Sequence, residues 1–304
     1  MSQAQTVKTD IRADSWIEQA LPARARPYAR LMRLDRPIGT WLLLWPGWWA
    51  LVLSGAGVFA WHFFILFAIG AVVMRGAGCT YNDIIDREID AKVARTASRP
   101  LPSGQVSLRQ AYVFLATQLA IGLAILLQFN FFAIVVGAAS MVLVFTYPFM
   151  KRITYWPQAW LGLTFNWGAL LGWACAKGEI GWLAVLLYLG GLLWTLGYDT
   201  IYAHQDREDD ALVGVKSSAL ALGGRSKPFI AICYAAAIML FALAIPLAQW
   251  SLLVLASVGV AAAHATWQVV TLDINNPQNC LSRFRSNRDL GALIMLALVF
   301  AQIS

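Results

Sequence analysis

The stretch NDIIDREIDAKVARTASRPLPSG, from Asn82 to Gly104, decides how the rest of the chain is interpreted. It places Asp83, Asp86 and Asp90 directly after a long apolar run. If a helix continues through it, Asn82, Asp86 and Asp90 fall at i, i+4 and i+8 on one face. Close carboxylates repel each other unless a cation lies between them, and oxygen ligands without Cys or His suit Mg²⁺. The pattern predicts a magnesium site at a helix end, and the alternative is an ordinary charged loop.

Two arginines follow these acids, Arg95 and Arg99. Guanidinium groups bind phosphate oxygens with strong, charge-assisted hydrogen bonds. An acidic helix end followed by arginines is therefore the pattern that a phosphorylated substrate with a bound cation requires.

Composition indicates a membrane protein. The 304 residues are 59% hydrophobic and only 13% charged, which is too apolar for a soluble domain of this size. Apolar runs recur along the chain, each close to the roughly 20 residues that cross a bilayer. They predict nine spans, at 38–58, 62–82, 109–128, 131–148, 158–176, 181–202, 229–247, 250–271 and 288–303. The four cysteines and three histidines are scattered, which argues against a disulfide framework or a zinc site.

The placement of charge explains the net charge of +7 without a nucleic-acid partner. All lysines and arginines except Arg75 and Lys177 lie in the N-terminal segment or in and beside the loops that follow even-numbered spans. By the positive-inside rule the N-terminus is expected to be cytoplasmic. Nearly all acids share that side, so polar chemistry is expected at the cytoplasmic face.

Residues 1–36 form a polar, arginine-rich segment, interpreted as a cytoplasmic tail with an amphipathic helix within 13–34. Residues 37–304 form the membrane domain. The tail has no secretory signal, and Asp10, Asp14 and Glu18 are atypical of a mitochondrial transit peptide. A bacterial inner membrane is therefore expected in preference to the mitochondrial inner membrane.

A second acidic stretch, GYDTIYAHQDREDDALVGVKSSA at 197–219, follows the sixth span. On a continuous helix Asp199, Tyr202, Asp206 and Asp210 lie close to one face. Lys216 follows them, as the arginines follow the first cluster. Polar groups at membrane depth are costly and usually mark a functional site. Two such stretches on the same side of the membrane predict two Mg²⁺ ions that would clamp a diphosphate.

The chain resembles the UbiA superfamily of membrane prenyltransferases. The family signatures NDxxDxxxD and DxxYAxxDxxxD are matched at 82–90 and 199–210. Further strings are similar to the members that use 4-hydroxybenzoate: RLDRPIGTWLLLWP at 33–46, RTASRPLPSG at 95–104, YPFMKRITYWPQ at 147–158 and GVKSSA at 214–219. The similarity runs from about Arg33 to the end of the sequence.

The resemblance implies nine transmembrane helices around a central cavity with cytoplasmic cap loops. It also implies a Mg²⁺-dependent transferase that moves a polyprenyl group from polyprenyl diphosphate to the 3-position of 4-hydroxybenzoate, a step of ubiquinone biosynthesis. The expected partners are these two substrates and the lipid bilayer, with no nucleic acid and no obligatory protein partner.

The resemblance assigns roles to individual residues. The candidate metal ligands are Asn82, Asp83, Asp86, Asp206 and Asp210. The candidate catalytic acids are Asp86, Asp90, Asp199, Asp206 and Asp210, of which Asp206 or Asp199 would assist phenol deprotonation. The candidate diphosphate-binding residues are Arg36, Arg95, Arg99 and Lys216. The candidate acceptor-binding residues are Lys151, Arg152, Asn166 and Tyr202.

Four of these residues also have a purely structural interpretation. Lys151 and Arg152 end a span and would also serve as interfacial anchors by snorkelling. Arg36, just before the first span, would equally be an anchor. Asn166 lies inside the fifth span and would equally make a structural hydrogen bond between helices.

Other functions compete with this one. A cation-coupled transporter also carries carboxylates within the membrane, but usually near the midplane on broken helices. Here the acids cluster at span ends on one side. A related prenyltransferase with another acceptor, such as homogentisate or a naphthoate, is the nearer alternative.

Overall fold

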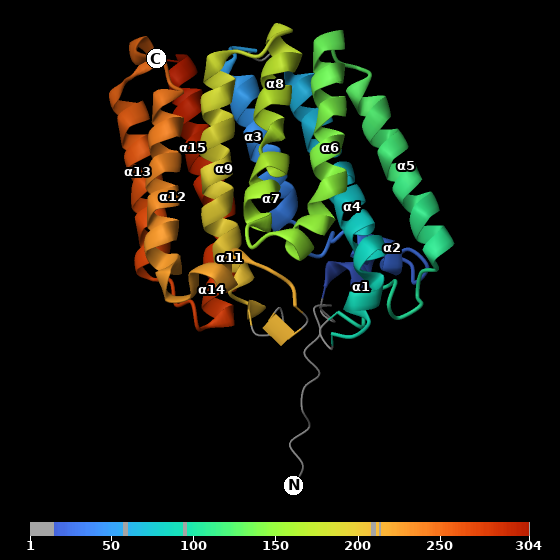
Figure 1. The fold of residues 1–304 in the computed structure, drawn as a ribbon. Helices are drawn as coiled ribbons and strands as arrows, with labels where there is room; N and C mark the ends of the chain where they lie inside the picture. Colours follow the sequence, from blue (N-terminus) through green and yellow to red (C-terminus); the bar gives the residue numbers. More distant parts are fainter. Residues whose placement is uncertain (1–14, 57–59, 94–95, 208–210, 213, 304) are drawn as a thin grey trace. The chain divides into compact units, whose positions relative to one another are not determined.

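A computed structural model describes residues 15–56, 60–93, 96–207, 211–212 and 214–303. Across these ranges the regular structure is helical and no strand occurs, which confirms the predicted all-α class (Figure 1). The chain divides into two compact units, one from 1–40 with 70–125 and the other from 41–69 with 126–304. Each unit is described by itself.

Long apolar helices make up most of both units. Their bounds are α3 Ile38–Leu53, α4 Trp61–Asp90, α5 Leu108–Leu126, α6 Phe131–Ile153, α7 Pro157–Phe165, α8 Trp167–Lys177, α9 Trp182–Ala203, α12 Ser226–Leu243, α13 Leu252–Val270 and α15 Asn287–Ile303. Among the described residues, seven helical stretches are long and apolar enough to cross a membrane. The predicted span 158–176 consists of the shorter α7 and α8, which meet at Asn166.

The first unit joins the end of the N-terminal segment to α4 and α5. Its short helices are α1 Trp16–Ala20 and α2 Arg26–Leu31. Buried apolar side chains from α2, α4, α5 and the segment just before α5 pack together, and they are Leu31, Ala77, Ile84, Val106, Ala111 and Leu115. This burial stabilises the unit, since roughly 25 cal/mol is gained per Å² of apolar surface removed from water. The end of the predicted tail is therefore part of a packed core.

The amphipathic helix expected within 13–34 is divided into two short helices. Leu21, which ends α1, has extended backbone angles of φ −106° and ψ 143°. Pro22 follows it, and a proline disfavours the helical conformation of the residue before it. Part of 13–34 is thus helical, and the amphipathic role of these helices at a membrane surface stays a prediction.

The second unit is organised around α9. This helix packs against α7, α8, α12 and α14, which spans Pro277–Arg285, while α13 packs against α12 and α15. Figure 1 shows α9, α12 and α13 side by side. Trp49 of α3 is fully buried, and its indole nitrogen donates to the carbonyl oxygen of Gly291 in α15 at 3.0 Å. Burial of the ring and its one donor together hold α3 against the last helix.

A buried polar network connects four helices of the second unit. The side-chain oxygen of Asn287 accepts from Trp194 of α9 at 2.8 Å and from Tyr234 of α12 at 3.1 Å. The Asn287 amide nitrogen donates to Gln268 of α13 at 3.0 Å. Buried polar groups are costly unless they are paired, so this network selects one packing of these helices.

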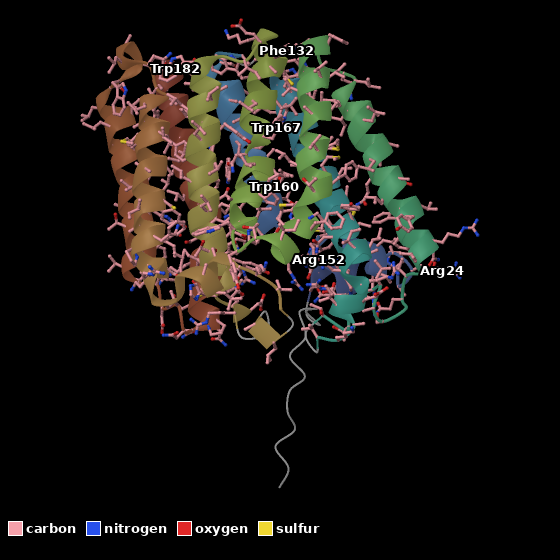
Figure 2. All side chains as sticks on the ribbon, viewed as in Figure 1. Arg24, Phe132, Arg152, Trp160, Trp167 and Trp182 are labelled. Atoms are coloured by element: carbon pink, nitrogen blue, oxygen red, sulfur yellow. The ribbon has the colours of Figure 1, made fainter. Side chains whose placement is uncertain are left out.

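The ends of the second unit differ in chemistry. Figure 2 shows Trp182 and Phe132 at one end and Arg152 at the opposite end, with Trp160 and Trp167 between. Arg152 lies in the last turn of α6, whereas Trp182 begins α9. Lys151 and Arg152 make the end of α6 cationic, and the positive-inside rule expects such a concentration of positive charge on one side of a membrane.

Candidate functional site

The first acidic motif lies on a continuous helix. The predicted span ended at residue 82, but α4 continues to Asp90. Asn82 is half-buried, and Asp86, one turn later, is only 1% exposed. The i, i+4 spacing of a helix places both side chains on one face. Asn82 and Asp86 therefore share one face of a helix in the first unit, as their spacing in the sequence predicts.

Two other acids of this motif bind arginines. Asp83 Oδ1 accepts from Arg33 Nη2 at 2.8 Å and from Arg99 Nη1 at 3.4 Å. Arg99 Nη1 also donates to Asp90 Oδ2 at 2.8 Å. Along this chain of ion pairs, Arg33, Asp83, Arg99 and Asp90, the charges alternate in sign. Arg95, the other predicted phosphate ligand of this segment, lies outside the described residues.

The second acidic motif differs from its prediction. α9 ends at Ala203, and Asp206 lies in the turn beyond it. Asp199 and Tyr202 are still on the helix, and the Tyr202 ring lies 4.6 Å from that of Phe284. The prediction that Asp206 shares a continuous helical face with Asp199 is therefore wrong. Asp210 lies outside the described residues.

A buried histidine follows the end of α9. His204 is 5% exposed, and its Nε2 shares a hydrogen bond of 2.8 Å with the hydroxyl of Ser226. Burial, with a smaller contribution from the charge of Arg207, lowers the pKa of His204 to about 4. The imidazole is therefore neutral near pH 7, and it adds no positive charge for binding an anion. His204 ties α9 to the start of α12 instead.

Lys216 binds the last turn of α6. Its backbone amide donates to the carbonyl oxygen of Lys151 at 2.9 Å, and its ammonium donates to that of Ile153 at 3.1 Å. The ammonium also lies 5.5 Å from the centre of the Tyr155 ring. A predicted diphosphate ligand and a predicted acceptor residue, far apart in sequence, are thus brought together in the second unit.

The next residues strengthen this attachment. Gln158 is buried, and its side-chain oxygen accepts from the backbone amide of Ser218 at 3.1 Å. The Ser218 hydroxyl shares a hydrogen bond of 2.8 Å with Thr200 of α9. Gln158 and Ser218 lie inside the quoted strings at 147–158 and 214–219, but neither received a role, because no spacing rule links such distant residues.

Two further predicted cationic ligands, Arg152 and Arg36, lie at or next to a helix end. Arg152 is exposed in the last turn of α6, with its guanidinium 6.0 Å from the centre of the Phe149 ring. Arg36 precedes α3 in the first unit and pairs with Asp35 at 3.2 Å. Both positions suit an interfacial anchor as well as a ligand, so the binding roles stay predictions.

Asn166 forms the structural bond that sequence reasoning left as its alternative. It is 1% exposed, and its amide nitrogen donates to Gly162 of α7 at 2.8 Å and to the Thr195 hydroxyl of α9 at 2.7 Å. An asparagine enclosed in this way joins helices. Its predicted role in acceptor binding is not supported by this geometry.

The donor set suits a hard cation, but the described residues do not assemble a metal site by themselves. No group of three His, Cys, Asp or Glu side chains gathers in the part of the chain that the structure describes. The ligands that the motifs offer are carboxylate and amide oxygens, from Asn82, Asp86 and Asp206. Such oxygens fit Mg²⁺, which often keeps several waters and takes few protein ligands.

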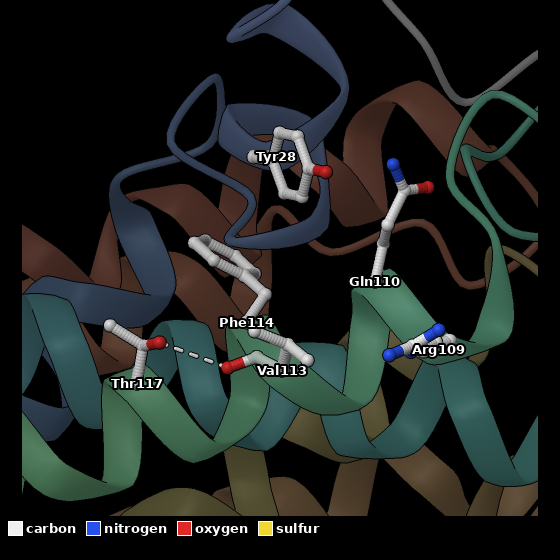
Figure 3. A pocket seen from close by; sticks show the side chains of 6 residues that line it. All are labelled: Tyr28, Arg109, Gln110, Val113, Phe114 and Thr117. Carbon is white, nitrogen blue, oxygen red and sulfur yellow. Dashed lines mark hydrogen bonds between the residues drawn. The ribbon is translucent and has the colours of Figure 1, made fainter.

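A shallow groove of about 430 Å³ lies elsewhere in the first unit. Figure 3 shows the six side chains that line it, which come from α2 and the first turns of α5: Tyr28, Arg109, Gln110, Val113, Phe114 and Thr117. None of them is a predicted site residue, so this groove is separate from both acidic motifs.

Sequence comparison identifies the family. The profile described as the UbiA prenyltransferase family matches residues 43–296. A human relative named 4-hydroxybenzoate polyprenyltransferase, mitochondrial, is 47% identical over 290 residues, which cover 94% of this chain and 78% of the relative. An Arabidopsis thaliana relative of the same name is 48% identical and covers 96% of this chain and 72% of its own.

Solved structures share the fold. An apo UbiA homolog from Aeropyrum pernix K1 has a TM-score of 0.70 at 27% identity, covering 87% of this chain and 96% of that one. A UbiA homolog from Archaeoglobus fulgidus, bound to GPP and Mg²⁺, has a TM-score of 0.64 at 17% identity and covers 90% and 99% of the two chains. The second likeness shows the fold alone.

The names of the relatives correct one expectation. A bacterial inner membrane was expected, but the relatives just named are mitochondrial proteins of eukaryotes. The expectation rested on acids in the N-terminal segment, and two of them, Asp10 and Asp14, lie outside the described residues. Hydropathy does not distinguish the two membranes, because the hydrocarbon thickness to be crossed is similar.

Proposed function

Because the chain belongs to the UbiA prenyltransferase family, we propose that it transfers a polyprenyl group from polyprenyl diphosphate to 4-hydroxybenzoate. The identity of 47% over 94% of the chain to a 4-hydroxybenzoate polyprenyltransferase carries this proposal. The new bond forms at the ring carbon ortho to the hydroxyl. The product is a substituted 4-hydroxybenzoate of the kind that ubiquinone biosynthesis consumes.

In this proposal four cationic side chains bind the diphosphate: Arg36, Arg95, Arg99 and Lys216. Arg99 is held at the end of α4 by Asp90, while Lys216 and Arg36 are further cationic donors. Charge-assisted hydrogen bonds to the diphosphate oxygens become stronger as the leaving group gains charge. Arg95 adds a second guanidinium in the same segment.

Oxygen ligands of the two motifs hold Mg²⁺ in this proposal: Asn82 and Asp86 on α4, and Asp206 with Asp210 after α9. Bound Mg²⁺ would neutralise the negative charge that develops on the departing diphosphate. The Archaeoglobus fulgidus homolog that is bound to GPP and Mg²⁺ supports a divalent cation.

The reaction exchanges one bond for another. The allylic C–O bond breaks, and the diphosphate leaves with the electron pair. The electron-rich ring carbon then forms a C–C bond to the allylic carbon, and the ring loses a proton. Asp199 or Asp206 would assist by accepting the phenol proton, since a carboxylate within hydrogen-bond reach can act as a general base.

The acceptor carboxylate needs a cationic partner. Arg152 is the candidate, because a guanidinium can bind a carboxylate with two parallel hydrogen bonds. Lys151 precedes it at the same end of α6, and Tyr202 lies in the last turn of α9. Residues 37–304 form the transferase domain in this proposal, and the mitochondrial names of the relatives favour a mitochondrial membrane.

Prenyl transfer in isolated membranes tests the function. Geranyl diphosphate and 4-hydroxybenzoate are supplied with and without Mg²⁺, for the wild type and for Asp86→Ala. Glu88→Ala is the matched control, because Glu88 is an exposed carboxylate on the same turn of α4. We expect a Mg²⁺-dependent 3-geranyl product that Asp86→Ala loses and Glu88→Ala retains. A folded wild type that prenylates other phenols such as homogentisate, but never 4-hydroxybenzoate, would refute the assigned acceptor.

A further inference from the structure

Arg33 has an unusual backbone for its residue type. It lies between α2 and α3, and it is the one non-glycine residue with a positive φ, 56°, among the residues that the structure describes. The left-handed conformation costs an ordinary residue about 1 kcal/mol or more. A cost of this kind persists only where surrounding contacts compensate for it. Two backbone bonds that end α2 support this conformation, from the Leu34 amide to the carbonyl oxygen of Ala29 at 3.1 Å and from the Arg33 amide to that of Arg30 at 3.0 Å. The turn directs the Arg33 side chain into an ion pair with Asp83.

This ion pair is largely buried. The side chain of Asp83 is 1% exposed and that of Arg33 is 13% exposed, with 2.8 Å between the nitrogen and the oxygen. The same oxygen, Asp83 Oδ1, also accepts from Arg99, whose side chain is 13% exposed. Asp83 therefore joins the segment before α3 to the loop after α4. It does so from a position on α4 itself.

The position of Arg99 follows from this arrangement. Asp83 and Asp90 are seven residues apart, which places them on one face of α4 two turns from each other. Arg99 contacts both, so its guanidinium is held along the helix between two carboxylates. With Arg33 included, two positive charges balance two negative charges. Removing Arg33 or Asp83 takes away one partner of a largely buried ion pair, which is unfavourable.

We propose that Arg33 and Asp83 are positioning residues, which fix the Arg99 guanidinium for the diphosphate. In this proposal Asp83 binds Arg33 and Arg99. The metal ligands of this motif are then Asn82 and Asp86. The inference rests on the proposed function, because it concerns the diphosphate of that reaction. It assigns a role to Arg33, and it replaces the metal role that the motif alone suggested for Asp83.

Three substitutions of Arg33 separate the effects of its positive charge, its planar guanidinium group and its backbone conformation. Arg33→Gln removes the charge, Arg33→Lys keeps the charge without the planar fork, and Arg33→Gly removes the side chain while relieving the strained φ. Arg26→Gln is the matched control, because Arg26 pairs with Glu18 in the same unit and has no contact with Asp83.

The measurements are the KM for geranyl diphosphate, the KM for 4-hydroxybenzoate, Mn²⁺ affinity by electron paramagnetic resonance, and the thermal unfolding midpoint. We expect Arg33→Gln and Arg33→Gly to raise the diphosphate KM about tenfold, as loss of a supporting contact typically does. Arg33→Lys should fall between them and the wild type. The KM for 4-hydroxybenzoate and the Mn²⁺ affinity should stay as in the wild type, and Arg26→Gln should change neither KM.

Asp83→Asn tests the other half of the proposal. We expect it to raise the diphosphate KM as Arg33→Gln does and to leave Mn²⁺ affinity unchanged, whereas Asp86→Asn weakens Mn²⁺ binding. Equal losses of Mn²⁺ affinity in Asp83→Asn and Asp86→Asn would overturn the positioning role. An Arg33→Gly variant with the wild-type diphosphate KM would also overturn it, because the side chain would then be dispensable. Failure of the proposed function is distinguishable, since the wild type would then make no product while still binding Mn²⁺.

Discussion

The ammonium group of Lys216 donates to the carbonyl oxygen of Ile153 at 3.1 Å, although 63 residues separate the two in sequence. The backbone amide of Lys216 makes a second bond in the same place, to Lys151 at 2.9 Å. The last turn of α6, which carries Arg152, and the segment after the second motif are therefore connected by two hydrogen bonds. A substrate that recruits the ammonium would release one of the two bonds and leave the other in place.

Lys216→Met is expected to weaken diphosphate binding selectively. The substitution removes the ammonium, and a hydrogen bond to a charged group is worth roughly 1.5–3 kcal/mol, so the diphosphate KM should rise about tenfold or more. The backbone bond to Lys151 survives, so the 4-hydroxybenzoate KM should change little. Steady-state kinetics with each substrate varied in turn would check this. An equal rise in both KM values would instead show that the ammonium mainly holds the loop.

Arg152→Ala is expected to act on the acceptor. Loss of a carboxylate partner should raise the 4-hydroxybenzoate KM about tenfold, with a much smaller effect on the diphosphate KM. Lys177→Ala is the control, since Lys177 is an exposed cation in the last turn of α8. Equal changes in the two KM values, or none, would leave Arg152 as an interfacial anchor.

Asn166→Ala is expected to lower stability without changing acceptor binding. It removes the 2.7 Å bond to Thr195, and a net loss of about 1 kcal/mol is typical of one buried hydrogen bond. Thr195→Val deletes the same bond from the other side and should give a similar decrease. Tryptophan fluorescence during thermal unfolding in detergent provides the measurement. A large rise in acceptor KM at an unchanged unfolding midpoint would contradict the structural role.

Gly172→Ala is expected to destabilise the second unit. A β-carbon at Gly172 in α8 would lie 2.5 Å from the carbonyl oxygen of Gly47 in α3, so the two backbones would have to separate. Close helix approach at small residues is a principal source of packing in membranes. We expect a loss of roughly 1–3 kcal/mol, the usual effect of overpacking. Gly259→Ala in α13 is the control, because its β-carbon would meet no atom within 4 Å.

Asn287→Ala is expected to loosen the helices that its network joins. Trp194 loses its acceptor and Gln268 loses a donor, and unsatisfied buried groups cost about 1–3 kcal/mol. Asn275→Ala removes the same side chain at an exposed site and should be neutral. Thermal unfolding of the two variants side by side would test this. An Asn287→Ala variant as stable as Asn275→Ala would show that the network adds nothing to stability.

Much of the candidate site could be predicted because its rules are local. Once a helix is assigned, the i, i+4 spacing places Asn82 and Asp86 on one face, and α4 does continue through both residues. The same reasoning failed at Asp206, because α9 ends at Ala203. No glycine or proline marks that end. Beyond that end the buried His204 pairs with Ser226, a partner 22 residues away that no local pattern indicates.

The sequence by itself determined that this is an all-helical membrane protein, where its apolar spans lie, and which oxygen and cationic groups are available for a diphosphate. These properties follow from hydropathy and spacing, because the bilayer thickness and the helix repeat act on neighbouring residues. Only the tertiary structure decided that Arg33 pairs with Asp83, that Asn166 joins α7 to α9, and that Lys216 binds the end of α6. Such pairings join residues about 30 to 60 positions apart. The local sequence allows many other partners for each side chain, and only the packing of the folded chain selects one of them.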